Sequence, residues 1–138
     1  MAENRSKQPL VRYLDQTQAL DCPYGSVRRV VTAGAGGVAN VHVVSVTKGT
    51  PHVHAGYDEV YYVLAGNGRI WIGETEYALR PGAAAVIPAG MPHALEAAPG
   101  EALQFVIFGT PPVPLDDARA RPERAVIDAF PAEKRNEP

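Results

Sequence analysis

The chain has 138 residues, of which 46% are hydrophobic and 20% are charged, and its formal net charge at pH 7 is −2. A chain of this length buries roughly two thirds of its surface on folding, so it can form one compact domain without disulfide or metal staples. The near balance of charges excludes a basic field for nucleic acid, and the single cysteine, Cys22, excludes an intramolecular disulfide and a cysteine-based zinc cluster.

The N-terminal residues 1–9 are polar, and we expect them to be flexible. They lack the apolar core of a signal peptide, and no apolar run elsewhere approaches the length of a membrane span. We therefore expect a cytoplasmic protein that does not associate with membranes. The next stretch, residues 10–14, is predicted to add an outer strand or a short turn.

Between residues 41 and 108, short apolar stretches alternate with glycine and proline, which is the pattern of many short strands. β-branched and aromatic residues favour strands, and the glycines of turns such as residues 65–68 tolerate positive φ. Strands are predicted at 41–47, 59–64, 69–72, 76–79, 84–87, 93–96 and 102–108. With no long helix between them, these strands predict an all-β sandwich or barrel over residues 10–110, and they exclude a parallel α/β fold.

Residues 111–138 form a proline-rich tail. The prolines at 111–114 keep the start of the tail extended and out of any central strand. Residues 122–129 are compatible with one short helix that ends at Pro131, and the alternative is a mobile segment. If the helix forms, its apolar face needs a surface on this barrel or on a partner subunit.

Three histidines and one glutamate have the spacing of a metal site. His52 and His54 are two residues apart, so on a strand they point to the same face. Glu59 follows a four-residue connection, where the chain can turn back and place a carboxylate beside the two imidazoles. His93 comes from far along the chain. Imidazole and carboxylate ligands together suit divalent Fe, Mn, Ni, Co, Cu or Zn.

The segment around the first three of these residues resembles the first motif of the cupin superfamily. That motif is His-x-His, three or four residues, Glu, six residues, Gly. In this chain, His52-x-His54 is followed by four residues, Glu59, six residues and Gly66.

The second cupin motif is also present. It reads Gly, five residues, Pro-x-Gly, two residues, His, three residues, Asn, and this chain has Gly82, five residues, the Pro-Ala-Gly turn of residues 88–90, two residues and His93. The usual Asn is replaced by Ala97, and the glycine expected six positions before the first His is Val46. Neither departure removes a metal ligand, and the resemblance covers residues 41–108.

The resemblance implies a single double-stranded β-helix, or jelly roll, that holds one divalent transition metal per chain through His52, His54, Glu59 and His93, with Fe favoured. Such an ion keeps one or two open positions for water, O₂ or a bidentate substrate. Because small cupins include dioxygenases, lyases, cyclases, isomerases and sugar-binding proteins, the fold does not determine the reaction. We favour a metal-dependent enzyme, a non-haem oxygenase before the others, acting on a substrate that chelates the ion through oxygens. The alternatives are a Zn-type lyase, cyclase or isomerase, and a non-catalytic sugar or small-ligand binder.

Tyr61 is the candidate substrate-binding residue. By strand alternation, Tyr61 and Val63 share the face of Glu59, while Tyr62 and Leu64 take the other face. The hydroxyl of Tyr61 can therefore lie near the open side of the metal. The alternative is an aromatic side chain that only fills the core.

Other polar residues have less specific interpretations. His42 lies outside both motifs, and we expect it to be structural or on the surface. Arg28 and Arg29 are expected at a solvated strand edge, although one guanidinium can bind an anionic substrate. The thiol of Cys22 is expected to be inert, because nothing beside it lowers its pKa.

The resemblance also implies an assembly. Cupins commonly pair through a sheet face, and an apolar outward face needs covering. We expect a homodimer, with the segment 113–130 contributing to its stability.

Overall fold

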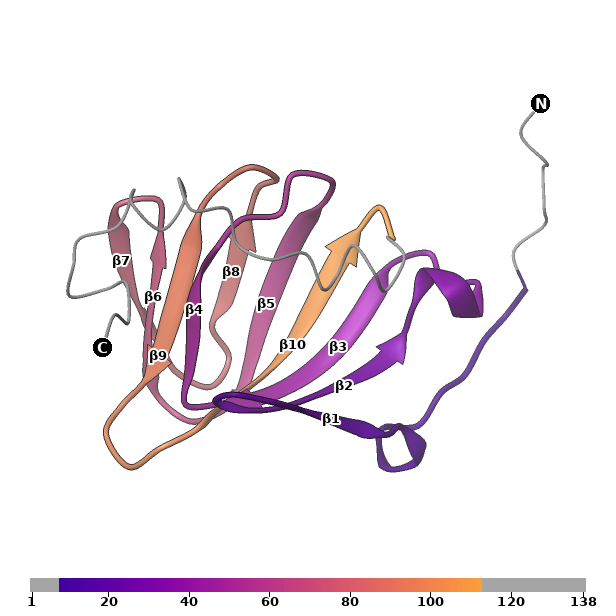
Figure 1. Cartoon of the computed structure of the whole chain (residues 1–138), viewed down its shortest axis with the longest axis horizontal. Coiled ribbons are helices and arrows are strands. Elements are labelled where there is room, and N and C mark those ends of the chain that lie inside the picture. The colour runs from indigo at the N-terminus through magenta and orange to yellow at the C-terminus, as the bar shows by residue number, and fades with distance from the viewer. Residues whose placement is uncertain (1–7, 113–138) are drawn as a thin grey trace.

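Ten strands and two short 3-10 helices make up residues 8–112, the part of the chain that this computed structural model describes (Figure 1). The 3-10 helices are η1 (Leu14–Gln16) and η2 (Ala33–Ala35). The strands are β1 (Ala19–Cys22), β2 (Gly25–Val31), β3 (Asn40–Val46), β4 (Lys48–His52), β5 (Asp58–Ala65), β6 (Gly68–Ile72), β7 (Thr75–Leu79), β8 (Ala84–Ile87), β9 (His93–Ala97) and β10 (Leu103–Thr110).

The strands form two antiparallel sheets. The larger sheet has the order β1-β2-β3-β10-β5-β8, and the smaller has the order β4-β9-β6-β7. One buried cluster joins the two sheets, with Val63 and Phe105 from the larger sheet and Ile70 and Leu95 from the smaller. The sheets therefore pack face to face in a jelly roll, as the sequence predicts. No helix among residues 8–112 is long and apolar enough to span a bilayer.

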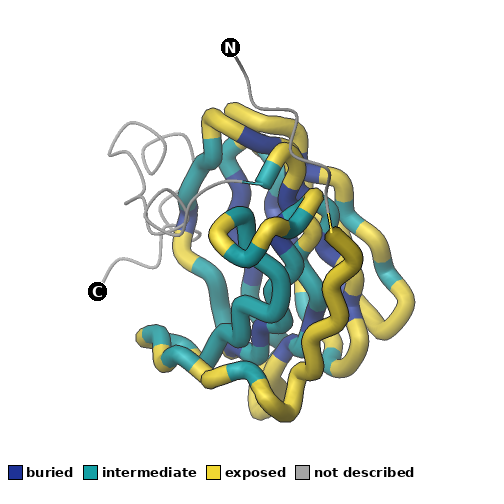
Figure 2. Tube along the Cα trace, turned by 90° about the vertical axis from the view of Figure 1, so that its right-hand side faces the viewer, coloured by how far each residue is buried: buried dark blue, intermediate teal, exposed yellow. Residues whose placement is uncertain are grey.

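Side-chain alternation along the strands creates the core, and Figure 2 shows buried residues interleaved with exposed ones. On β5, Glu59, Tyr61 and Val63 are buried, while Tyr62 and Leu64 are exposed. This is the pattern predicted from the sequence. Burying such side chains stabilises the fold by about 1.5–3 kcal/mol each for the large apolar ones.

All seven strands predicted between residues 41 and 108 are present, with ends within two residues of the predicted ones. Residues 10–13 are not an outer strand, and the chain makes the one-turn helix η1 directly after them, which agrees with the alternative of a short turn. The helix predicted at 122–129 lies outside the described residues, and so do residues 1–7 of the N-terminal segment 1–9 for which flexibility was predicted.

The expectation of a strand edge at Arg28 and Arg29 is wrong. The chain turns at residues 23–24, and β1 pairs with the outer side of β2, with Ala19 opposite Arg28. The other side of β2 pairs with β3. The two arginines therefore sit inside the larger sheet and point to opposite faces of it.

Candidate metal centre

The four predicted ligands come together from both sheets. His52 is the last residue of β4 and His93 is the first residue of β9, and these two are direct partners in the smaller sheet. Glu59 is the second residue of β5 in the larger sheet. One potential ligand atom from each of the four residues, including His54, lies within 4.8 Å of the others. The group can therefore hold one metal ion.

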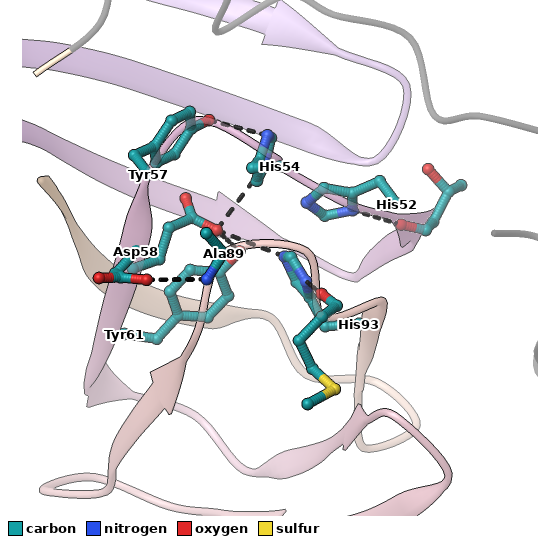
Figure 3. Close-up of polar contacts among 10 residues, drawn as sticks. His52, His54, Tyr57, Asp58, Tyr61, Ala89 and His93 are labelled. Carbon is teal, nitrogen blue, oxygen red and sulfur yellow. Dashed lines mark hydrogen bonds and ion pairs between the residues drawn. The ribbon is translucent and has the colours of Figure 1, made fainter. Parts of the chain in front are cut away.

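His54 reaches this cluster from a loop, so the expectation that strand alternation places it there is wrong. β4 ends at His52, and His54 lies two residues beyond that end. The backbone N–H of Gly90 donates to the carbonyl of His54 over 2.8 Å. The turn of the second motif, and not a neighbouring strand, therefore fixes the position of this peptide. The Oδ1 atom of Asp58 accepts the backbone N–H of Ala89 at 2.8 Å and joins the two motifs again (Figure 3).

Two of the imidazoles approach one carboxylate oxygen, and the third lies beside them. Glu59 Oε1 lies 3.4 Å from His93 Nε2 and 3.7 Å from His54 Nε2. The ring centroid of His52 is 4.1 Å from that of His93 and 4.8 Å from that of His54. Figure 3 shows the three rings gathered on one side of the site. These separations suit ligands that share an ion at metal–nitrogen and metal–oxygen distances of about 2.0–2.2 Å.

Each imidazole is oriented through its other nitrogen. His52 Nδ1 lies 2.7 Å from the carbonyl of Thr50, and His93 Nδ1 lies 3.0 Å from the carbonyl of Met91. Because a carbonyl only accepts, both Nδ1 atoms carry the proton and both Nε2 atoms present a lone pair. Carbonyl partners of this kind fix the tautomer of metal-binding histidines.

Tyr57 orients the third imidazole, and the sequence analysis did not identify it. Its hydroxyl is 2.8 Å from His54 Nδ1, and its ring stacks on the imidazole with centroids 4.7 Å apart. With the lone pair of His54 Nε2 directed to the cluster, Nδ1–H donates to the tyrosine oxygen. The sequence signal that could have identified Tyr57 is its position as an aromatic residue, next to Asp58, in the four-residue connection between the ligands His54 and Glu59.

The pKa shifts of the candidate ligands favour the protonation states that bind a cation. Burial, followed by the charge of His93, lowers the pKa of His52 to about 3, and burial also lowers the pKa of His54. Burial acts to raise the pKa of Glu59, but His93 and the other imidazoles outweigh it and lower that pKa. Neutral imidazoles and an ionised carboxylate are the forms that bind metals.

His93 supplies a separate test of this fit. Its Nε2 atom is buried and has no hydrogen-bond partner among the described residues, although Glu59 Oε1 lies nearby. A buried ring nitrogen beside a carboxylate, with no hydrogen bond between them, is costly unless a cation joins the two groups. The donor set therefore fits a divalent transition metal.

The cluster forms part of the wall of a cavity of about 420 Å³ between the sheets, which is partly open to solvent. Tyr61 lines this cavity and donates a long hydrogen bond of 3.4 Å to Glu59 Oε1. It is also only 4% exposed, and its ring packs against that of Phe105 with the two centroids 5.0 Å apart. The two interpretations of Tyr61, pocket residue and core residue, therefore describe one position.

Two polar residues of β3 also face the cavity. His42, which we expected to be structural or on the surface, lines the cavity together with Asn40. Arg29 and Cys22 line it as well. By contrast, the guanidinium of Arg28 lies outside the cavity and donates to the carbonyls of residues 14 and 17.

The two departures from the cupin motifs are accommodated by packing. Val46 is buried in the core at 7% exposure, and Ala97 ends β9 and packs against that core. The backbone N–H of Ala97 donates to the carbonyl of Thr47 at 2.7 Å.

Two facing antiparallel sheets around an internal His-His-Glu-His cluster define a jelly-roll protein with a candidate metal centre. The chain belongs to the cupin family, because the Cupin domain family matches residues 40–109. No curated protein sequence matches the chain.

Solved structures agree with this fold. Ectoine synthase from P. lautus superposes with a TM-score of 0.70 at 20% identity, covering 83% of this chain and 90% of that one. KdgF from Halomonas sp. has a TM-score of 0.64 at 24% identity, covering 76% and 96%. The polyketide cyclase RemF from Streptomyces resistomycificus has a TM-score of 0.62 at 20% identity, covering 74% and 79%. Identities this low establish the shared fold and leave the reaction open.

Proposed function

We propose that this cupin is a metal-dependent enzyme that binds one divalent transition ion through His52, His54, Glu59 and His93. Its substrate is a small molecule that chelates the ion through oxygens. The observation that carries the proposal is the convergence of three oriented imidazoles and one carboxylate on the wall of a partly open cavity of about 420 Å³. Cavities of this size hold small-molecule ligands.

When bound, such an ion supplies Lewis acidity, a template for oxygen ligands or redox chemistry. The chain's own residues then position the substrate and hold protons. Burial, and next the charge of Glu59, raise the pKa of Tyr61 well above its ordinary value, so its hydroxyl stays protonated. The Tyr61 hydroxyl therefore acts as a hydrogen-bond donor to the carboxylate or to a substrate oxygen beside it.

The favoured subclass is an Fe(II)-dependent oxygenase. The carboxylate lowers the net charge of the site and favours a divalent ion that can change its oxidation state. The second candidate is a lyase, cyclase or isomerase with a redox-silent ion. It is favoured by Tyr61 and His42, which line the cavity and can hold or move protons without oxygen. The enzymes named ectoine synthase and polyketide cyclase among the structural neighbours are consistent with this candidate.

Oxygen consumption tests the proposal. Protein purified without chelators is analysed for its metals and then reconstituted with Fe(II) or Zn(II) under anaerobic conditions. It is next screened against enols, diketones, phenols, hydroxy acids and sugars. We expect substrate-dependent O₂ uptake with Fe(II) only. Turnover that is equal with Zn(II) and needs no O₂ would assign the lyase or cyclase class, and saturable binding of a sugar without any turnover would assign the binding protein.

We also propose that the chain is a homodimer that pairs through the outer face of the larger sheet. Large apolar side chains are exposed there on neighbouring strands, with exposures of 64% for Val86, 43% for Tyr62, 45% for Leu64 and 42% for Phe108. The strand register places Phe108, Val60 and Val86 in one cross-strand row. A contiguous apolar face of this kind suits a self-complementary two-fold contact.

Light scattering of the full chain is expected to give twice the mass of one chain. Because a buried charge without a partner is costly, the pair Tyr62→Lys and Val86→Lys should convert the protein to a monomer. Tyr77→Lys is the matched control, since Tyr77 is 51% exposed on β7 of the other sheet. A wild-type protein that has the mass of one chain across a wide concentration range would remove the dimer proposal. The contribution expected from residues 113–130 is tested by deleting them.

A further inference from the structure

Two side chains of β3 give the cavity a second polar wall, apart from the metal ligands. Asn40 is the first residue of β3, and His42 lies two positions further along the strand, so both side chains point to the same face of the larger sheet. Both residues line the cavity. The next residues on this face, Val44 and Val46, are apolar and line it as well. The polar part of the wall is therefore confined to the first turn of the alternation.

This polar wall lies across the larger sheet from the metal cluster. Asn40 is opposite Gly109 of β10, which is opposite the metal ligand Glu59 of β5. Neighbouring strands are about 4.8 Å apart, so the strand of Asn40 runs roughly 10 Å from that of Glu59. A Cβ on Gly109 would lie 3.3 Å from the ring of Tyr57 and 3.6 Å from the Cβ of Asn40. The glycine therefore keeps the stretch between the amide and the metal cluster free of a side chain.

One polar atom of each side chain is buried without a hydrogen-bond partner within residues 8–112. The two atoms are Asn40 Oδ1 and His42 Nε2, and Asn40 as a whole is only 4% exposed. Buried polar atoms are nearly always paired in folded proteins, because an unpaired atom loses its hydrogen bonds to water and gains none in return. Such atoms in the wall of a cavity are suited to bind a polar group of a ligand.

Both groups are uncharged at pH 7. Burial, and next the charge of Arg29, lower the pKa of His42 to about 4, so its imidazole is neutral. A neutral imidazole has one nitrogen that donates and one that accepts, whereas the amide oxygen of Asn40 only accepts. The matching ligand group must therefore donate to Asn40 Oδ1. It must also accept from His42 Nε2 or donate to it, according to the tautomer.

Hydroxyl groups meet both requirements. A hydroxyl donates one hydrogen, its oxygen accepts, and it rotates to suit its partners. It therefore pairs with Asn40 Oδ1 and with either tautomer of His42. A carboxylate has no hydrogen to donate to the amide oxygen, and an ammonium group has no lone pair for an imidazole N–H.

We propose that Asn40 and His42 form a subsite for an uncharged, hydroxyl-bearing end of the substrate, whose other end faces the metal cluster. The proposal rests on the proposed function and adds its substrate class. That class is a small molecule with chelating oxygens at one end and at least one hydroxyl group at the other. The apolar side chains of Val44 and Phe105 line the same cavity and suit the carbon chain between the two ends.

Calorimetry with matched acids tests the subsite. The probes are 2,4-dihydroxybutanoate, 2,5-dihydroxypentanoate and 2,6-dihydroxyhexanoate, whose lengths sample different spans of the cavity. Each is compared with the acid in which a methyl group replaces the terminal hydroxyl, and with the diacid in which a carboxylate replaces it. All of them share the 2-hydroxy acid end that chelates an ion. With Zn(II)-loaded protein, we expect one dihydroxy acid to bind at least about tenfold more tightly than both of its counterparts, because only the hydroxyl pairs the buried atoms.

Two variants remove the polar atoms of the subsite and keep side chains of similar size. Asn40→Leu and His42→Phe should each abolish or reverse the preference for the hydroxyl, while the zinc content and the circular dichroism stay unchanged. Asn67→Leu is the matched control, because Asn67 Nδ2 donates to Glu101 Oε1 at 3.1 Å away from the cavity, and the preference should survive in it. If Asn40→Leu does not fold, His42→Phe carries the test by itself.

The subsite is overturned if no dihydroxy acid is preferred by the wild type, or if the preference is unchanged in both variants. Tighter binding of a diacid than of its dihydroxy counterpart would also overturn it. Zinc content is measured on the same samples, which separates this result from the proposed function. Protein that binds its ion but does not prefer a hydroxyl refutes the subsite alone. Protein that binds no ion but keeps an Asn40-dependent preference refutes the metal enzyme and supports the hydroxyl subsite.

Discussion

Replacing both His52 and His54 with alanine is expected to abolish stoichiometric binding of a divalent ion. The change removes two of four ligands whose donor atoms lie within 4.8 Å of one another. A ligand that binds only the folded state at a hundredfold excess over its Kd stabilises it by about 2.7 kcal/mol, or a Tm shift of roughly 10 °C for a domain of this size. We expect that shift with the wild type and none with the double variant. Elemental analysis and thermal unfolding with and without added metal measure both effects.

The fold of the double variant should survive, because neither residue belongs to the main buried cluster of the core. A β-rich circular dichroism spectrum like that of the wild type checks this point. His42→Ala is the matched control, since it removes the one histidine outside the cluster and should leave the metal content unchanged. Full retention of metal by the double variant would refute the assignment of these ligands.

The strands could be predicted because their signal is local. On β5, the alternation of Val60, Tyr61, Tyr62 and Val63 assigns each side chain to a face without knowledge of its partners. The same rule applied to β3 would have found His42, because His42, Val44 and Val46 alternate along one strand and all three line the cavity. The cupin motifs directed attention away from His42, which lies outside them.

The missed features depend on contacts between distant parts of the chain. The inward direction of Arg29 follows from its pairing with His42, and that pairing requires the position of β2 between β1 and β3. The loop position of His54 follows from the hydrogen bond with Gly90, which is 36 positions further along the sequence by their numbers. Sequence spacing could identify all three ligands of the first motif, but only the folded chain shows how the second motif holds His54 in position.

Glu59→Gln is expected to weaken the metal site even though it preserves size and one carbonyl oxygen. Glu59 is 5% exposed, and its Oε1 is the atom that approaches both His93 and His54. Loss of the negative charge removes the attraction for the cation and leaves an amide beside the imidazole lone pairs. We expect the metal Kd, measured by competition with a chelator, to rise at least about tenfold, which corresponds to roughly 1.4 kcal/mol.

Activity should also fall at least about tenfold when excess metal restores occupancy, because the Lewis acidity and redox poise of the ion depend on this carboxylate. Glu76→Gln is the control, since Glu76 pairs with Arg69 on the exposed surface of the smaller sheet and should change neither quantity. Tyr61→Phe, measured in the same assays, separates the role of the Tyr61 hydroxyl from that of the Glu59 carboxylate. If its metal Kd is unchanged but its rate falls, the hydroxyl acts on the substrate, and if both stay unchanged, Tyr61 serves only packing. A Glu59→Gln protein with the metal Kd and the rate of the wild type would mean that the carboxylate is not a ligand, and the site would have to be reassigned to the three histidines.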